Sequence, residues 1–156
     1  MIVRHIYVAD KHNFYGHHGK EPSNYPMIEL GEAKCEKGMG IIGDRFYNYK
    51  PDYKGQITFF SWEVYEDICR MFKLKGLCPS IFRRNVIVSE VDLNSLIGET
   101  FTVQGINFLG TQEAAPCYWM NGAVATNAED AMKGRGGLRA KILTSGTLKK
   151  DNRPIE

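Results

Sequence analysis

Apolar residues come mainly in short runs of strand length along this chain, often alternating with polar residues. Such runs predict β-strands, and they lie at residues 1–10, 27–35, 56–61, 84–90, 99–113 and 138–146. The first run is apolar on both sides, as in a strand that is buried on both faces. The run 99–113 is long enough for two strands, and Gln104-Gly105 near its centre predicts a hairpin turn. The pattern thus predicts about seven strands.

One segment, residues 61–75, has the spacing of an amphipathic helix. Its apolar residues recur at i, i+4, i+7 and i+8, and they are Val64, Ile68, Met71 and Phe72. Ser61 can cap the start of this helix, and Gly76 can end it. Residues 92–98 predict a short helical turn, and residues 126–132 a second short helix.

The predicted strands follow one another without helical crossovers, which favours a mostly antiparallel sheet. Such a sheet is most economically closed as a barrel. No repeat or linker divides the chain, and 156 residues are enough to bury a core without disulfides. We therefore predict a mainly β fold, a closed β-barrel with a few peripheral helices, in a single domain of residues 1–156.

Composition excludes several classes of function. The net charge of +2 is too small to predict binding to nucleic acid or to an anionic membrane. No apolar run approaches the roughly 20 residues needed to span a bilayer. Residues 1–10 lack the hydrophobic core of a signal peptide, so the expected location is the cytoplasm.

Four cysteines stand at positions 35, 69, 78 and 117, and no two of them form a CxxC pair. A zinc knuckle or a thioredoxin-type redox centre is therefore poorly supported. A disulfide framework is not expected in a chain of this size and compartment. We interpret the cysteines as reduced thiols, of which one or two carry chemistry.

The segment GTQEAAPCYWMNG, residues 110–122, contains the strongest chemical signal. Pro116 cannot donate a hydrogen bond to a sheet, so the chain leaves its strand there. Cys117 follows where a strand gives way to a loop. Its thiol is a metal ligand or a nucleophile in one interpretation, and a small packed hydrophobe in the other.

Two further segments carry more polar chemistry than a fold requires. In GDRF, residues 43–46, Asp44 and Arg45 either hold a carboxylate and a guanidinium at the barrel mouth or form an ordinary Asx-turn. Before a predicted strand, Arg84 and Asn85 offer a fork of donors and an amide, which suit a phosphate or the edge of a heterocycle. The alternative for this pair is simple solvation.

Basic and imidazole side chains form the remaining candidates. The segment GRGGLRAK, residues 134–141, combines glycines with Arg139 and other cations, which suits an anion, although a glycine turn before the final strand is the favoured interpretation. His12, His17 and His18 lie in a long polar and aromatic loop. Their spacing fits neither a HExxH helix nor a facial triad with an evident carboxylate, so contact with substrate or no role is favoured over metal ligation.

Taken in order, these segments resemble the MOSC domain, which is named for the C-terminal part of molybdenum cofactor sulfurases. The matching pieces are GIIGDRF at 40–46, QITF at 56–59, RRNVIVSEVDLNSLIGETFTVQG at 83–105, GTQEAAPC at 110–117 and GRGGLRAKILTSG at 134–146. The N-terminal HNFYGHHG is similar to one stand-alone bacterial branch of the family.

The resemblance implies a β-barrel and a molybdenum cofactor site. In family members that bind this cofactor, the cysteine matching Cys117 is the protein ligand of the metal, and residues matching Arg84 and Asn85 help to hold the pterin. A soft thiolate suits such a sulfur-rich metal centre. We extend the cofactor site to Arg45 and Arg139, with Asp44 orienting substrate or moving protons.

The implied function is the reduction of N-hydroxylated compounds. Breaking an N–O bond needs two electrons, and the chain has no flavin or iron–sulfur motif, so a separate reductase partner is expected. Whether the chain is an enzyme stays open at this point. The alternative is a carrier that accepts sulfur from a cysteine desulfurase as a persulfide on Cys117 or delivers the cofactor. Pyridoxal phosphate is not expected, because no lysine motif assigns it.

A cysteine hydrolase is a third hypothesis, with a histidine of residues 12–18 as the base. We predict that Asp44, Arg84, Asn85 and an accessible Cys117 line one pocket, without a tetrahedral zinc set. We expect it because antiparallel neighbours place the start of strand 84–90 beside the end of strand 106–113. His12, His17 and His18 should lie near its rim.

Overall fold

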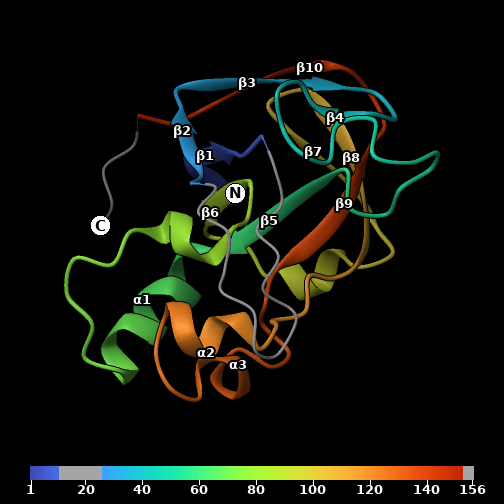
Figure 1. Cartoon of the computed structure of the whole chain (residues 1–156). Coiled ribbons are helices and arrows are strands. Elements are labelled where there is room, and N and C mark those ends of the chain that lie inside the picture. Colours follow the sequence, from blue (N-terminus) through green and yellow to red (C-terminus); the bar gives the residue numbers. More distant parts are fainter. Residues whose placement is uncertain (11–25, 153–156) are drawn as a thin grey trace.

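Ten strands form two sheets in the computed structural model, which describes residues 1–10 and 26–152 (Figure 1). The larger sheet contains β1 (Ile2–Val8), β2 (Ile28–Leu30), β5 (Ile57–Ser61), β6 (Val86–Ser89), β7 (Thr100–Val103), β8 (Ile106–Glu113) and β9 (Leu138–Ile142). Its order is β2-β1-β6-β5-β9-β8-β7. The smaller sheet contains β3 (Glu32–Glu36), β4 (Gly40–Ile41) and β10 (Gly146–Lys149), in the order β10-β3-β4. The mainly β fold is thereby confirmed.

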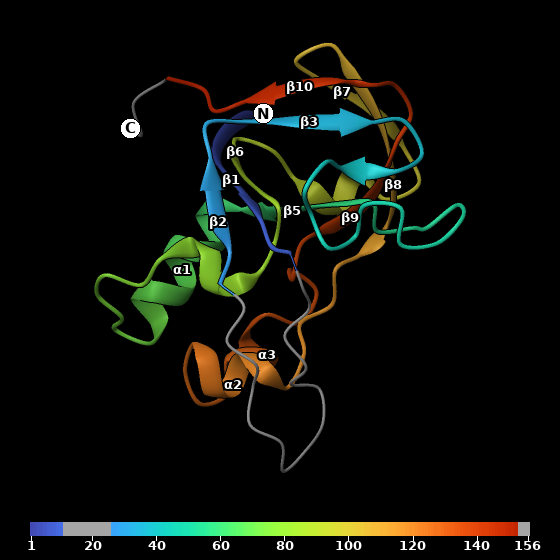
Figure 2. The same cartoon turned by 45° about the horizontal axis from the view of Figure 1, so that its top comes forward.

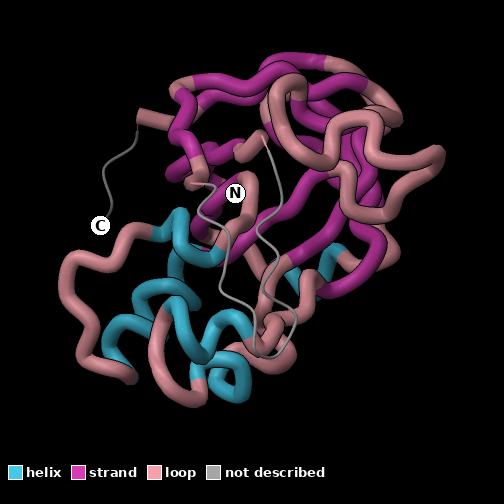
Figure 3. The backbone as a smooth tube through the Cα atoms, viewed as in Figure 1, coloured by secondary structure: helices cyan, strands magenta, loops and turns pink. Residues whose placement is uncertain are grey.

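Short helices gather mostly on one side of the strands (Figure 3). They are α1 (Trp62–Met71), α2 (Trp119–Ala123) and α3 (Ala128–Ala131), with two 3₁₀ turns, η1 (Pro79–Phe82) and η2 (Leu93–Leu96). The cap at Ser61 is confirmed, because its side chain accepts a hydrogen bond from the Val64 amide. The helix ends earlier than predicted, since Lys73 takes a left-handed conformation before Gly76 is reached. None of the helices in the described residues has the length and apolar character needed to cross a membrane.

The larger sheet is mixed, which corrects the expectation of a sheet without helical crossovers. β5 pairs in parallel with β6, and the chain passes through α1 and η1 between them. A parallel pair needs such a crossover, because the second strand must begin again at the same end of the sheet. The other pairings of this sheet are antiparallel, and the predicted hairpin between β7 and β8 is confirmed at Gln104-Gly105.

The prediction of a closed barrel is wrong for the described residues. β2 and β7 are the outer strands of the larger sheet and do not pair with each other. After Gly31 the chain leaves this sheet, and β3 pairs instead with β10 and β4. Figure 2 shows the smaller sheet lying over the larger one. The strands therefore form two separate sheets instead of one closed barrel.

Apolar side chains fill the space on both sides of the larger sheet. Phe59 lies in the cluster between the two sheets, where it packs against the rings of Phe101 and Phe108. Its neighbour Phe60 points the other way and stacks on Phe82, in a second cluster under the helices. Because successive strand residues face opposite sides, the central strands are apolar throughout, which confirms that β1 is buried on both faces.

Candidate functional site

A cavity of about 160 Å³ opens at one end of the larger sheet, between the loops that follow β4 and β8. Its wall contains Arg45, Arg83, Arg84 and Arg139 together with Cys117. Among the described residues that line it there is no aspartate or glutamate. The cavity therefore combines one thiol with a concentration of positive charge, which suits an anionic ligand.

The register of the larger sheet brings the segment with Arg84 and the segment with Cys117 together. Val86 at the start of β6 pairs with Phe59, Phe59 pairs with Leu138, and Leu138 pairs with Glu113 at the end of β8. This row of four residues places Arg84 and Cys117 at the same edge. The outcome agrees with our expectation, but the reason differs, because β6 and β8 are separated by two strands and run in the same direction. The start of β6 and the end of β8 reach the same edge of the sheet because the four strands are offset from one another along their length.

Cys117 lies just outside the regular structure. β8 ends at Glu113, and the Cys117 carbonyl accepts a hydrogen bond from the Met120 amide at 3.0 Å, at the turn that begins α2. The thiol is exposed, as predicted. Cys35, in contrast, is buried, and burial raises the pKa of its thiol to about 12. Of these two thiols, only that of Cys117 is accessible to a ligand.

Arg84 lies next to Cys117 in the wall, but its guanidinium is occupied by the protein. It donates to the backbone carbonyls of Gly136 at 3.0 Å and Ala114 at 2.9 Å, and also to those of Phe82 and Ala115. Burial lowers its pKa to about 10, so it remains charged at neutral pH. Its side chain joins loops that come from distant parts of the sequence.

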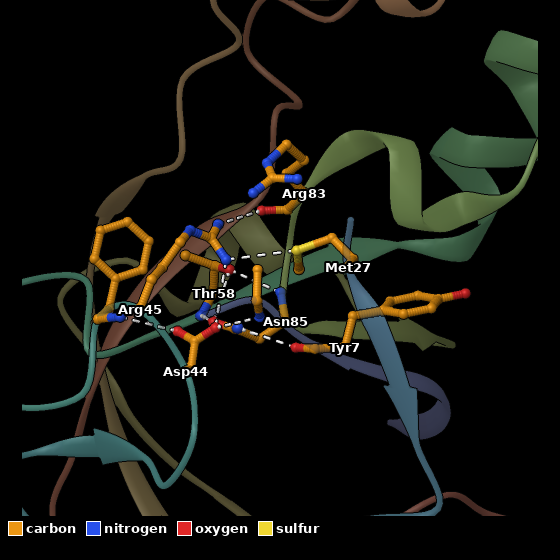
Figure 4. A network of polar contacts seen from close by, with 9 residues as sticks. Tyr7, Met27, Asp44, Arg45, Thr58, Arg83 and Asn85 are labelled. Carbon is orange, nitrogen blue, oxygen red and sulfur yellow. Dashed lines mark hydrogen bonds and ion pairs between the residues drawn. The ribbon is translucent and has the colours of Figure 1, made fainter. Parts of the chain in front are cut away.

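Contrary to our expectation, Asn85 is fully buried and does not line the cavity. Its carbonyl oxygen accepts from the amide and the hydroxyl of Thr58, and its NH₂ group donates to the Tyr7 carbonyl at 3.1 Å (Figure 4). Asn85 therefore connects β1 and β5 where β6 begins.

Asp44 also lies behind the cavity wall, buried beside Arg45. Its carboxylate accepts from the amides of Ala9 and Phe46 and from the Arg45 guanidinium at 3.3 Å. Arg45 donates in turn to the Arg83 carbonyl at 3.1 Å (Figure 4). Its guanidinium also lies over the Phe46 ring. These contacts are those of an Asx-turn that fixes the direction of Arg45 toward the cavity.

Arg139 differs from these arginines in its contacts. It extends from β9 into the cavity wall, and within the described part of the chain its guanidinium has no hydrogen-bond or ion-pair partner. An arginine in such a wall has five donors to offer an anion. Arg139 is therefore the candidate for direct contact with a negatively charged ligand.

Aromatic side chains also line the cavity, and we did not predict them from the sequence. They are Phe46, Tyr53 and Trp119, and the rings of Phe46 and Tyr53 stack with centroids 5.5 Å apart. Phe46 belongs to the segment GDRF, beside Asp44 and Arg45, and Trp119 belongs to GTQEAAPCYWMNG, beside Cys117. That proximity was the available signal, because flat rings beside cations suit a planar ligand.

His12, His17 and His18 lie outside the described residues. The hypothesis of a cysteine hydrolase depends on one of them and stays a prediction. Among the described residues, no three His, Cys, Asp or Glu side chains gather as a metal-binding group.

The MOSC domain family model matches residues 16–153, which is most of the chain. The chain belongs to the MOSC domain family. The match includes Cys117 and the four arginines of the cavity wall.

Solved structures share the fold of this MOSC domain. The YuaD protein from Bacillus subtilis is 19% identical with a TM-score of 0.71, and the match covers 95% of this chain and 90% of that one. YiiM from Escherichia coli is 18% identical with a TM-score of 0.61, covering 94% of this chain and 66% of that one. YiiM from Geobacillus stearothermophilus is 10% identical with a TM-score of 0.68, covering 95% and 70%. At such identities the likeness concerns the fold alone. No curated protein matches the sequence.

Proposed function

We propose that this MOSC domain binds a molybdenum cofactor and, with electrons from a separate reductase, reduces N-hydroxylated compounds. The observation that carries the proposal is the exposed thiol of Cys117 in a cavity wall with four arginines and no acid among the described lining residues. Family membership supports the choice of cofactor. Other anions would be attracted by the arginines, but the thiolate favours a soft transition metal.

The donor set has the chemistry that two parts of such a cofactor need. A thiolate is a suitable ligand for a sulfur-rich molybdenum centre, and Cys117 is the thiol in this cavity. The phosphate of a pyranopterin needs charged donors, and the Arg139 guanidinium has no hydrogen-bond or ion-pair partner in the described residues. Cys117 would hold the metal and Arg139 the phosphate.

The other residues in and behind the cavity wall would contact the cofactor or position its contacts. Arg45 contributes charge to the wall, and Asp44 acts through Arg45 by fixing its direction. Phe46, Tyr53 and Trp119 offer flat apolar surface to planar groups. When bound, the cofactor would supply the two-electron chemistry of the reduction.

Molybdenum content tests the proposal directly. We expect wild-type protein from a host that makes the cofactor to contain molybdenum by elemental analysis, and Cys117→Ala to lose it, because the thiolate ligand is missing. Cys78→Ala is the matched control, since Cys78 is also exposed but does not line the cavity, and it should keep the metal. Metal-free wild-type protein, or equal metal in wild type and Cys117→Ala, would rule the proposal out.

A sulfur carrier is the second candidate function, favoured by the accessibility of Cys117 and the lack of a carboxylate among the described lining residues. A desulfurase persulfide would pass its outer sulfur to the Cys117 thiolate and be left as a thiol. Intact-mass measurement after incubation with cysteine desulfurase and cysteine should then show one added sulfur on wild type and none on Cys117→Ala. If no sulfur maps to Cys117, this candidate fails.

A further inference from the structure

Arg84 is bound to four backbone carbonyls that come from three separate parts of the chain. Its Nε donates to Gly136, one terminal nitrogen donates to Ala114 and Ala115, and the other donates to Phe82. No ion pair of Arg84 with a carboxylate is found in residues 1–10 and 26–152. A guanidinium is suited to this arrangement because its five donors point in fixed directions in one plane.

The segment before Cys117 and the glycine loop are in direct backbone contact. The Ala114 amide donates to the Gly137 carbonyl at 2.8 Å, and the Gly136 amide donates to the Glu113 carboxylate at 3.2 Å. A Cβ at Gly136 would lie 2.4 Å from the Ala114 carbonyl oxygen and 2.8 Å from Cδ of Pro116. The contact therefore exists only because residue 136 has no side chain.

We propose that Arg84 is a positioning residue, which together with Gly136 locks the segment Ala114–Pro116 in place and so fixes Cys117 at the cavity. Pro116 precedes Cys117 directly and is held against Gly136. The Arg84 guanidinium donates hydrogen bonds to the carbonyls of the two residues before Pro116. The consequence for the metal rests on the proposed function, whereas the lock itself does not.

This role differs from that of an arginine that binds a phosphate. A lysine ammonium can replace an arginine as a charge beside a phosphate, but it cannot reach carbonyls in four directions at once. Arg84→Lys therefore separates the two roles. A positioning arginine is not replaced by lysine, whereas a phosphate-binding arginine is replaced at least in part.

The experiment compares wild type, Arg84→Lys and Gly136→Ala by hydrogen exchange of metal-free protein and by molybdenum content. Exchange in the peptide that contains residues 113–118 should rise by about tenfold or more in both variants, because one or more hydrogen bonds of the lock are lost. Exchange in β1 and β6 should not change. Gly122→Ala is the control, since a Cβ there meets nothing within 4 Å, and it should behave as wild type.

The outcomes distinguish the lock from the proposed function. Unchanged exchange at residues 113–118 in Arg84→Lys, or full molybdenum in a variant whose segment exchanges faster, would overturn the proposal. Metal-free wild type with faster exchange in both variants would keep the lock and remove the cofactor. If both variants fail to fold, hydrogen exchange of the wild-type Ala114 amide tests the proposal. The lock requires this amide to exchange as slowly as a strand amide, and fast exchange would overturn it.

Discussion

At the residue scale, Asn85 is a buried polar side chain whose amide makes its hydrogen bonds within the protein. Both ends of its amide are bonded within the protein, to Thr58 on β5 and to the Tyr7 carbonyl on β1. A buried amide of this kind stabilises the fold only while all its partners are present, because an unsatisfied polar group is costly to bury. Its position next to Arg84 in sequence thus does not make it a ligand-binding group.

Replacing Asn85 should therefore affect stability rather than ligand contact. We expect Asn85→Ala to lower the free energy of unfolding by about 2–4 kcal/mol, because buried groups of Thr58 and Tyr7 lose their partner. Urea denaturation followed by circular dichroism measures this. Asn107→Ala is the control, since Asn107 is exposed, and it should change stability by less than about 1 kcal/mol. An Asn85→Ala protein as stable as wild type would contradict this account.

At the scale of elements, α1 depends on its first residue. Ser61 is the last residue of β5 and also the N-cap of α1, where its hydroxyl accepts from the Val64 amide at 3.2 Å. The helix has only ten residues and carries the chain between two parallel strands. Because short helices are marginal by themselves, the cap and the packing of Ile68 together determine where α1 begins.

Removal of the cap should destabilise the protein by a modest amount. We expect Ser61→Ala to lower the free energy of unfolding by about 1 kcal/mol, because one amide of the first turn loses its acceptor. Ser61→Thr keeps a hydroxyl at the same place and should recover most of this loss. The midpoints of urea unfolding for the three proteins test the prediction, and equal losses for alanine and threonine would contradict it.

At the scale of the whole molecule, both faces of the larger sheet are covered. The smaller sheet covers one face, and the helices cover the other. Several ionisable groups are enclosed as a result. Burial raises the pKa of Cys35 to about 12 and that of Tyr65 to about 12, and it also raises the pKa of Tyr7 above its ordinary value.

These raised pKa values predict that the protein loses stability in alkali. An unfolded cysteine releases its proton above its ordinary pKa of 9.0, whereas folded Cys35 keeps it until about pH 12. Between these values the folded chain binds more protons, so the free energy of unfolding falls as the pH rises. The contribution of Cys35 reaches about 1.4 kcal/mol per pH unit at most.

Urea unfolding at pH 8 and pH 10 measures the effect. We expect lower stability at pH 10, with a smaller difference between the two pH values in Cys35→Ala. Ile41→Val is the control, since Ile41 pairs with Cys35 and belongs to the same core cluster but does not ionise. It should lower stability equally at both pH values. A Cys35→Ala protein with the wild-type difference would contradict the assignment.

Local chemistry was sufficient to predict much of this protein. Alternating apolar residues located most of the strands, Ser61 located the start of α1, and Gln104-Gly105 located the hairpin. Each of these depends on the conformational preference of a few neighbouring residues, which is a property of the sequence itself. β4 and β10 were missed, because strands of two and four residues beside glycines have too little pattern.

Only the tertiary structure decided how the candidate site is built. Sequence order suggested that Arg84 and Cys117 lie together, but the register across β6, β5, β9 and β8 is what brings them to one edge. A tight turn fixes the register of a hairpin, but β5 and β6, and likewise β8 and β9, are joined through helices, so no turn in the sequence specifies their register. The partners of Arg84 are backbone carbonyls. Because every residue has a carbonyl, the sequence does not indicate which ones Arg84 will bind.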